Sequence, residues 1–388
     1  MFANPDRQKK WAAKRKLALQ LCVFLYVFLL AAYRGEPGGP QLGDVALASL
    51  FAVVTWWPRD ALALAPPKPS RLPEVHRIFA LATVWTLVVN AIAAAWTGQP
   101  SLLYATIPYV HAWLALALLG EVAGALGSQT LLRTLAYGAL AALALAVVRA
   151  AVDDSQIKSR FGAGFADPNQ LGYFAILAAS IVCAAHHVLA VRVGPALVGC
   201  VAAGWLVVLS ASRSALLGFV TLGVLTFVRA PLWTIIGGIA AALGSLVVEH
   251  TAWDALPTRS TEVTTNLLER QIQMRGYTRV VEHPGYLLFG AGEGAFERFL
   301  EDGLAIELHN SVGSWLFSYG AVGVVLLSIA VATLLRGFAL TGGVLLAPAF
   351  VYGLGHQGLR FRALWLLVAA VALAADVALA QREQRSRL

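Results

Sequence analysis

The sequence has little charge, and this shortage sets its class. Only 13% of the 388 residues are charged, whereas about a quarter of the residues in a soluble protein of this length are charged. Hydrophobic residues make up 59% of the chain, and the mean hydropathy is +0.70. A soluble globular fold is therefore excluded, and an integral membrane protein is predicted.

Cysteines and metal-binding patterns are scarce as well. The three cysteines, Cys22, Cys183 and Cys200, lie inside apolar runs, which predicts small buried side chains rather than a disulfide framework. The eight histidines are scattered and no Asp-x-Asp pair occurs, so the spacing predicts no metal site. No cofactor, metal ion or nucleic acid is expected as a partner.

Long apolar runs dominate what remains. Runs near the roughly 20 residues that a helix needs to cross the hydrocarbon recur along the chain, whereas barrel strands alternate over about ten residues. We predict an all-α polytopic bundle of about 12 transmembrane helices, near 17–33, 42–57, 76–96, 102–120, 131–150, 170–190, 194–210, 214–229, 232–250, 311–335, 339–356 and 362–380.

The seventh and eighth predicted spans leave an alternative open. Both are short and punctuated by glycine, so they are either two helices or one broken helix.

The first apolar run is predicted to stay in the protein as its first span. It ends in Arg34-Gly35-Glu36-Pro37 rather than in a small-residue cleavage site.

The basic residues predict the orientation, because lysine and arginine in short loops favour the cytoplasm. The tail before the first span is basic, so both termini are predicted to be cytoplasmic. Alternation from there leaves Lys158 as the one lysine on the outer side, and the other outer basic residues are arginines. The guanidinium fork binds phosphate bidentately, so an anionic outer ligand is predicted. Pairing with local acids such as Asp153 and Glu282 is the structural alternative.

A polar segment, residues 251–310, divides the chain. We predict about nine spans in 1–250, a large periplasmic loop in 251–310, and the last spans with a cytoplasmic tail in 311–388. Within the loop, 262–282 has the pattern of an amphipathic helix that ends before His283-Pro284. It carries Arg275 and Arg279 on one stripe and Arg270 on the other side, and lying on lipid phosphate is their structural alternative.

Other candidates are each open to a structural interpretation. Asp167-Pro168-Asn169 suits a helix start by capping alone. Arg213 stands beside three serines at an outer helix end, where it either extends to headgroups or faces the bundle interior. His309 can accept a proton near neutrality or act as a cap. The run from Gly290 to Gly294 follows no strand and is predicted to be a turn. His111 is expected to bond to a neighbouring helix.

In their order these parts resemble the superfamily of bacterial O-antigen ligases and polymerases. The matching pieces are Asp167-Pro168-Asn169, Ser212-Arg213-Ser214-Ala215, and a late outer loop that contains Arg270, His283-Pro284, Phe289-Gly290-Ala291-Gly292 and His309-Asn310. The resemblance implies a GT-C-like membrane glycosyltransferase with a periplasmic helical loop domain. It would transfer a glycan from undecaprenyl diphosphate to a sugar hydroxyl of the lipid A core, without a metal.

The resemblance also implies roles for residues. Arg213 and Arg270 would hold the diphosphate, and His309 would serve as general base toward the acceptor hydroxyl. Arg275 and Arg279 compete with Arg270 for the second position. The further candidate substrate contacts are Arg160, Asn169 and Asn310. A single displacement would invert the anomeric centre.

The expected protein is thus a monomeric O-antigen ligase of the bacterial inner membrane, with its site facing the periplasm and membrane lipids around it. A repeat-unit polymerase using the same lipid-linked donor is the first alternative. A lipid flippase or secondary transporter is the second. It would place ionisable residues in mid-span and often show a repeated half, and the sequence shows little of either.

Overall fold

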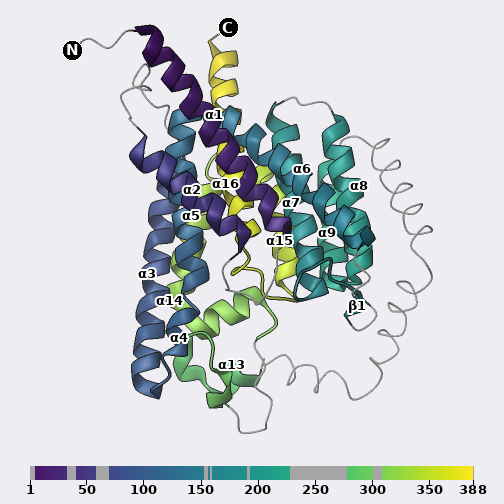
Figure 1. The fold of residues 1–388 in the computed structure, drawn as a ribbon. Coiled ribbons are helices and arrows are strands. Elements are labelled where there is room, and N and C mark those ends of the chain that lie inside the picture. Colours follow the sequence, from purple (N-terminus) through teal and green to yellow (C-terminus); the bar gives the residue numbers. More distant parts are fainter. Residues whose placement is uncertain are drawn as a thin grey trace.

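A computed structural model describes residues 5–32, 41–57, 70–152, 156–157, 160–189, 193–227, 278–299 and 308–387. These residues form an all-α polytopic bundle (Figure 1). Eight of the described helices are long and apolar enough to cross a membrane, and three shorter apolar helices accompany them. Together they match the predicted spans except 232–250, which lies outside the described residues, as does the predicted helical stretch 262–277.

The helices follow the chain in a simple order. They are α1 (Pro5–Leu29), η1 (Leu30–Ala32), α2 (Leu42–Trp56), α3 (Leu72–Thr97), α4 (Ser101–Tyr104), α5 (Ile107–Leu126), α6 (Ser128–Val152), α7 (Pro168–Leu189), α8 (Val193–Ser210), α9 (Arg213–Phe227), α13 (Thr278–Glu282), η3 (Pro284–Leu287), η4 (Phe296–Phe299), α14 (Ser311–Leu335), α15 (Ala339–Gly353) and α16 (Arg362–Ser386). Two strands of two residues, β1 (Gln156–Ile157) and β2 (Arg160–Phe161), pair antiparallel before α7.

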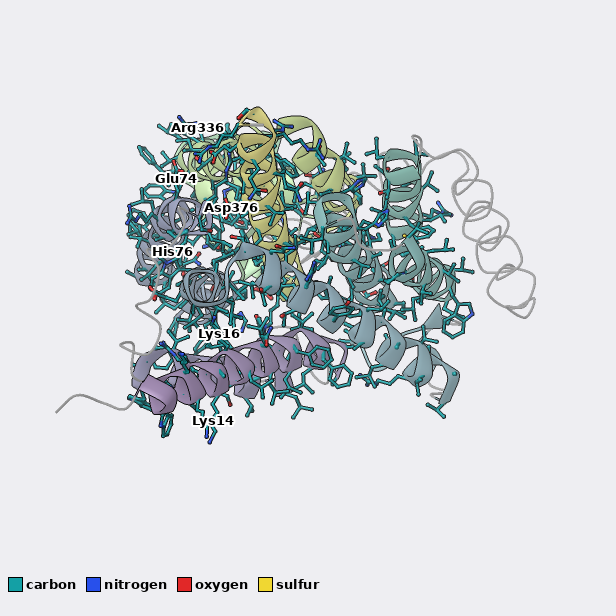
Figure 2. The ribbon with its side chains drawn as sticks, turned by 90° about the horizontal axis from the view of Figure 1, so that it is seen from above. Lys14, Lys16, Glu74, His76, Arg336 and Asp376 are labelled. Carbon is teal, nitrogen blue, oxygen red and sulfur yellow. The ribbon has the colours of Figure 1, made fainter. Side chains whose placement is uncertain are left out.

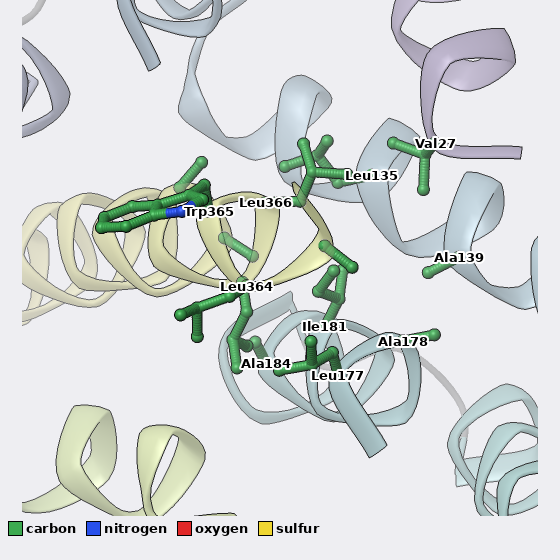
Figure 3. Packing of buried hydrophobic residues seen from close by; sticks show 14 of the residues in the cluster. Val27, Leu135, Ala139, Leu177, Ala178, Ile181, Ala184, Leu364, Trp365 and Leu366 are labelled. Carbon is green, nitrogen blue, oxygen red and sulfur yellow. The ribbon is translucent and has the colours of Figure 1, made fainter. Parts of the chain in front are cut away.

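Two helices, α7 and α16, form the centre of the bundle. Both are buried along most of their length, and α7 packs against α6, α8, α9, α15 and α16. Figure 3 shows Leu177 and Ile181 of α7 in the same apolar cluster as Leu364 and Leu366 of α16. Both helices are rich in alanine, which lets neighbouring backbones approach closely where no hydrophobic force from water drives association.

The seventh and eighth predicted spans are two separate helices. They meet at a turn in which Ala211 has a left-handed φ of 45°. A Cβ added to Gly204 of α8 would lie 2.9 Å from the ring of Phe219 in α9, so the two helices run back along each other as an antiparallel hairpin. The three cysteines are free; Cys183 and Cys200 are buried, as predicted, whereas Cys22 is only half-buried.

The bundle has two ends, which we name from what lies there. The terminal end is where α1 begins and α16 finishes (Figure 1). The cavity end is where α7, α9, α14 and α16 begin and where α15 finishes. Every helix start or finish at the cavity end belongs to a segment that the basic-residue pattern predicts to be outer.

Candidate functional site

A cavity of about 260 Å³ opens among the helix ends at the cavity end. Residues from both halves of the chain line it, so the fold brings distant segments together. One part of the lining is apolar and the rest carries imidazole, amide, carboxylate and guanidinium groups. The residues that carry these groups are Gln41, His111, Asp167, Asn169, Gln170, His309, His356, Gln357, Arg360 and Arg362, and Tyr173 and Tyr352 add two phenol rings.

Two predicted site residues, Asn169 and His309, line this cavity. Asn169 stands in the first turn of α7, where its backbone N–H donates to Oδ1 of Asp167 at 2.6 Å, so the predicted helix start is confirmed. His309 precedes α14, and its ring centroid lies 6.1 Å from that of His356. The ring of His356 stacks on Tyr352 of α15.

Asn310 is placed next to the cavity but works as a helix cap. Its Oδ1 accepts from the N–H of Gly313 at 2.8 Å, which caps α14, and its Nδ2 donates to the carbonyl of Leu354 at 2.9 Å. A side-chain oxygen at this position satisfies one of the free N–H groups of the first turn. Asn310 therefore fixes the start of α14 against the α15–α16 connection and so positions His309.

The α15–α16 connection forms another part of the cavity wall. Gln357 donates through Nε2 to the carbonyl of Leu308 at 2.9 Å and to Oγ of Ser314 at 2.6 Å. Ser311 donates through Oγ to the carbonyl of His356 at 2.9 Å. These bonds tie the connection to the first turn of α14, so the imidazoles on the two segments are held together.

Arg360, on this connection, lines the cavity and pairs with the buried carboxylate of Glu293. Its Nε lies 3.3 Å from Oε1 of Glu293, whose side chain is 2% exposed. Tyr109 and Tyr319 both donate to Oε2 of Glu293, at 2.9 and 2.5 Å. The backbone N–H of Glu293 donates to Oδ1 of Asn90 at 2.8 Å. Charge-assisted bonds of this kind fix the direction of the guanidinium.

The glycine-rich run from Gly290 to Gly294, here called the strap, positions Glu293 beside Arg360. The N–H groups of Ala291 and Gly292 donate to the carbonyls of Phe317 and Ser318, both at 2.9 Å. These carbonyls lie next to Gly320, where α14 is broken by a φ of 70°. A Cβ on Gly290 would collide with the carbonyl oxygen of Ser318. The run from Gly290 to Gly294 was predicted to be a turn, and it contains no helix. Its glycines let its backbone pack directly against the backbone of α14 near the break at Gly320.

A second carboxylate, Asp44 of α2, holds Arg362. Oδ1 of Asp44 lies 2.7 Å from Nη1 of Arg362 and 3.0 Å from Nε2 of His111. Bonding of His111 to a neighbouring helix is therefore confirmed. Arg360 and Arg362, which the sequence predicts to lie on the outer side, pair with acids, as the structural alternative proposed. Their partners, Glu293 and Asp44, are not the local ones.

Arg213 begins α9 at the cavity end but is exposed and does not line the cavity. Ser212 caps this helix by accepting the N–H of Ala215 at 3.4 Å. A Cβ on Gly355 would meet the hydroxyl of Ser214, so the start of α9 abuts the connection that carries His356. Arg160 lies in β2. Arg270 and Arg275 lie outside the described residues.

Arg279 lies beside two aromatic rings, those of Phe296 and Phe299. It belongs to α13, which ends at Glu282 as predicted, and it is 5% exposed. Its guanidinium carbon lies 5.4 Å from the ring centroid of Phe296 and 5.9 Å from that of Phe299. Burial lowers the pKa of Arg279. It also lowers the pKa of Arg298, which lies beside Phe299. Cation–π contacts offset part of this desolvation.

The sequence did not single out Glu293, His356 and Arg360. The signal for Arg360 was its predicted outer position, shared with other arginines. Glu293 was hidden in a glycine run, and nothing in the sequence connects it to α15 and α16. Among the described residues, no group of three or more His, Cys, Asp or Glu side chains is placed to hold a metal ion.

No model of a known protein family matches the sequence, and no curated protein was found to be similar to it. The residues of the cavity are therefore the basis on which a function is inferred.

Proposed function

We propose that this chain is an O-antigen ligase that moves a glycan from undecaprenyl diphosphate to a lipid A-core sugar hydroxyl. One observation carries the proposal. Asn169 and His309, which the resemblance assigns to one site, line a single cavity although they lie on distant segments. The cavity also holds Arg360 and Arg362 and lies at the end predicted to be periplasmic.

The chemistry requires charge stabilisation and a proton acceptor. The acceptor oxygen bonds to the anomeric carbon while the bond from that carbon to the diphosphate breaks. The electron pair leaves with the diphosphate, and the hydroxyl proton passes to an imidazole of the cavity. Preorganised cations stabilise the leaving phosphate. A guanidinium has five N–H donors, so an arginine that is oriented by a carboxylate on one edge can bind phosphate on another.

A reconstituted assay tests the proposal. The purified protein is mixed with an undecaprenyl-diphosphate-linked glycan and a lipid A-core acceptor, and the products are separated by mass. Glycan on the lipid A core supports a ligase. Glycan on a second lipid-linked unit indicates the polymerase instead, and donor crossing the bilayer without transfer indicates a flippase.

A matched pair of variants links the activity to the cavity. Arg360→Lys keeps the charge but loses the planar fork, so we expect the KM for the donor to rise at least tenfold. Arg133→Lys changes an exposed arginine of α6 at the terminal end, and its kinetics should match the unmodified protein. An unchanged donor KM in Arg360→Lys would remove this arginine from the donor site.

A further inference from the structure

Residues 288–293 lead into the strap and contact α3 between its middle and its outer end. The contacts are those of Phe289 with Trp85, Glu293 with Asn90 and Gly292 with Ala93. At a rise of about 1.5 Å per residue, about 18 Å of helix lie between Trp85 and Thr97, the last residue of α3. The segment therefore lies beside a helix long enough to span a membrane, and well inside the end of that helix.

The part of α3 beside this segment has an apolar outer surface. From Leu81 to Trp96, every exposed side chain of α3 is apolar. Trp96 is 89% exposed, and tryptophan is enriched where the hydrocarbon of a membrane meets water. The surface of α3 that faces lipid therefore extends past Trp85 and Asn90 toward Trp96.

The backbone of residues 288–293 has the hydrogen bonds that hydrocarbon requires. An unpaired N–H or C=O group costs several kcal/mol in the bilayer core, so irregular backbone at that depth needs partners within the protein. The N–H groups of Gly290, Ala291, Gly292 and Glu293 all donate, to the carbonyls of Tyr286, Phe317 and Ser318 and to Oδ1 of Asn90. The carbonyls of Leu288, Ala291 and Gly292 accept, from the N–H of Val322 and from Nη2 of Arg298.

The break in α14 at Gly320 supplies several of these partners. A broken helix leaves carbonyls without their usual acceptor role in the next turn, and the segment takes up those of Phe317 and Ser318. The carbonyl of Tyr319 accepts from Nε1 of Trp85 at 2.7 Å. A Cβ on Gly320 would collide with the carbonyl of Leu288. The broken helix and the segment thus satisfy each other without water.

Two large apolar side chains of the segment are exposed although its backbone is paired. Leu288 is 56% exposed and Phe289 is 58% exposed. Their neighbours continue the same surface, since Phe289 lies beside Trp85 of α3 and Leu288 bonds to Val322 of α14. One turn after Val322, Val325 of α14 is 55% exposed. The exposed pair is therefore continuous with the apolar surfaces of two membrane spans.

We infer that residues 288–293 form a re-entrant segment, in which Leu288 and Phe289 contact the acyl chains of the outer leaflet. The loop predicted to be periplasmic thus includes a part that lies in the membrane. Glu293 ends this segment and pairs with Arg360. The carboxylate that holds a cavity arginine is therefore anchored from the lipid side of the bundle.

Fluorescence quenching in vesicles tests this placement without any glycan donor, so its outcome is separate from that of the proposed function. Phe289→Cys is labelled with bimane in a protein whose half-buried Cys22 is replaced by alanine, and the parent without Phe289→Cys gives the background. The vesicles are phosphatidylcholine and contain no isoprenoid lipid. Nitroxide groups on the acyl chains should lower the emission about twofold or more, because the label lies within the hydrocarbon. Iodide in the water should have little effect.

Matched positions give the two reference values. Ile92→Cys on α3 is the lipid reference, because Ile92 is 63% exposed on the same apolar surface. Glu297→Cys in η4 is the water reference, because it replaces an exposed charged residue after the strap. Leu288→Cys is the second test position if Phe289→Cys does not fold.

Three outcomes decide the inference. Quenching of Phe289→Cys like that of Ile92→Cys supports it. Quenching by iodide as strong as that of Glu297→Cys, with none by the acyl nitroxide, places the segment in water and overturns it. Protection from both quenchers means that protein, such as a second copy of the chain, covers the pair, and this also overturns the contact with lipid.

Discussion

Each end of the bundle has a buried carboxylate beside an arginine, but the two carboxylates hold different parts of the structure. At the terminal end, Asp376 of α16 accepts from Oγ of Ser70 at 2.7 Å and from the N–H of Arg71 at 3.2 Å. Ser128, the first residue of α6, donates to it at 3.2 Å. At the cavity end, Glu293 accepts from two tyrosines and pairs with Arg360. Both carboxylates are mostly buried, with side chains 8% and 2% exposed.

The difference lies in what each carboxylate holds. The partners of Asp376 come from the starts of α3 and α6, where helix dipoles favour negative charge. Figure 2 looks onto this end and shows Asp376 among the helices, with Arg336 and Glu74 side by side nearby. Asp376 thus fastens helix ends to each other. Glu293 holds Arg360, which lines the cavity, so the same chemistry at the cavity end orients a side chain of the cavity wall.

Removing the charge of Glu293 should give the largest effect. Glu293 accepts hydrogen bonds from two tyrosines and pairs with Arg360, which is 34% exposed, and each hydrogen bond to a charged group contributes about 1.5–3 kcal/mol. Glu293→Gln should therefore lower the free energy of unfolding by about 3 kcal/mol or more, measured by SDS titration from mixed micelles. It should also lower glycan transfer, because Arg360 loses its orientation. Transfer at the unmodified rate by a stable Glu293→Gln protein would contradict this view of the cavity end.

Blocking the strap that carries Glu293 should rank second. Gly290 has a φ of 99°, and a Cβ there would collide with the carbonyl of Ser318. Left-handed backbone and overpacking each cost about 1–3 kcal/mol. Gly290→Ala should therefore lower the free energy of unfolding by about 2–4 kcal/mol. Gly223→Ala is the control, since a Cβ there meets nothing within 4 Å. It should be neutral or stabilising by about 0.5–1 kcal/mol.

The helices were the predictable part of this molecule. Their apolar runs are long and separated by short connectors, so span positions follow from the 20-residue requirement. The helix start at Pro168 follows from local capping by Asp167, which can be recognised in the sequence. His111 was predicted to find a partner helix because a polar group inside a membrane needs one.

The candidate site was only half predictable. Asn169 and His309 were named through their resemblance to a motif order. Glu293 and Arg360 meet only because a glycine run crosses a broken helix, and that contact depends on packing between segments far apart in the chain. No periodicity records such a contact. For the same reason Arg213, named beside His309, proved to lie outside the cavity lining.

Asp376→Asn should rank third and leave function intact. A hydrogen bond to a charged group contributes about 1.5–3 kcal/mol, and asparagine keeps the shape but loses the charge. The free energy of unfolding should fall by that amount. Glycan transfer by the folded protein should stay within about twofold, because the hydrogen-bond partners of Asp376 in the described part of the chain, Ser70, Arg71 and Ser128, do not line the cavity. A selective loss of transfer with normal stability would mean that the terminal end also tunes the site.

Arg336→Ala should have the smallest effect and completes the comparison within the terminal end. Its Nη1 lies 4.0 Å from Oε1 of Glu74, and the two side chains are 79% and 56% exposed. Exposed ion pairs contribute about 0.2–1 kcal/mol because water screens the charges and both side chains lose freedom. A double-mutant cycle with Glu74→Ala should give a coupling of about 0.5 kcal/mol or less. A coupling above about 1 kcal/mol would show that burial is not what separates the structural pair at Asp376 from its exposed neighbour.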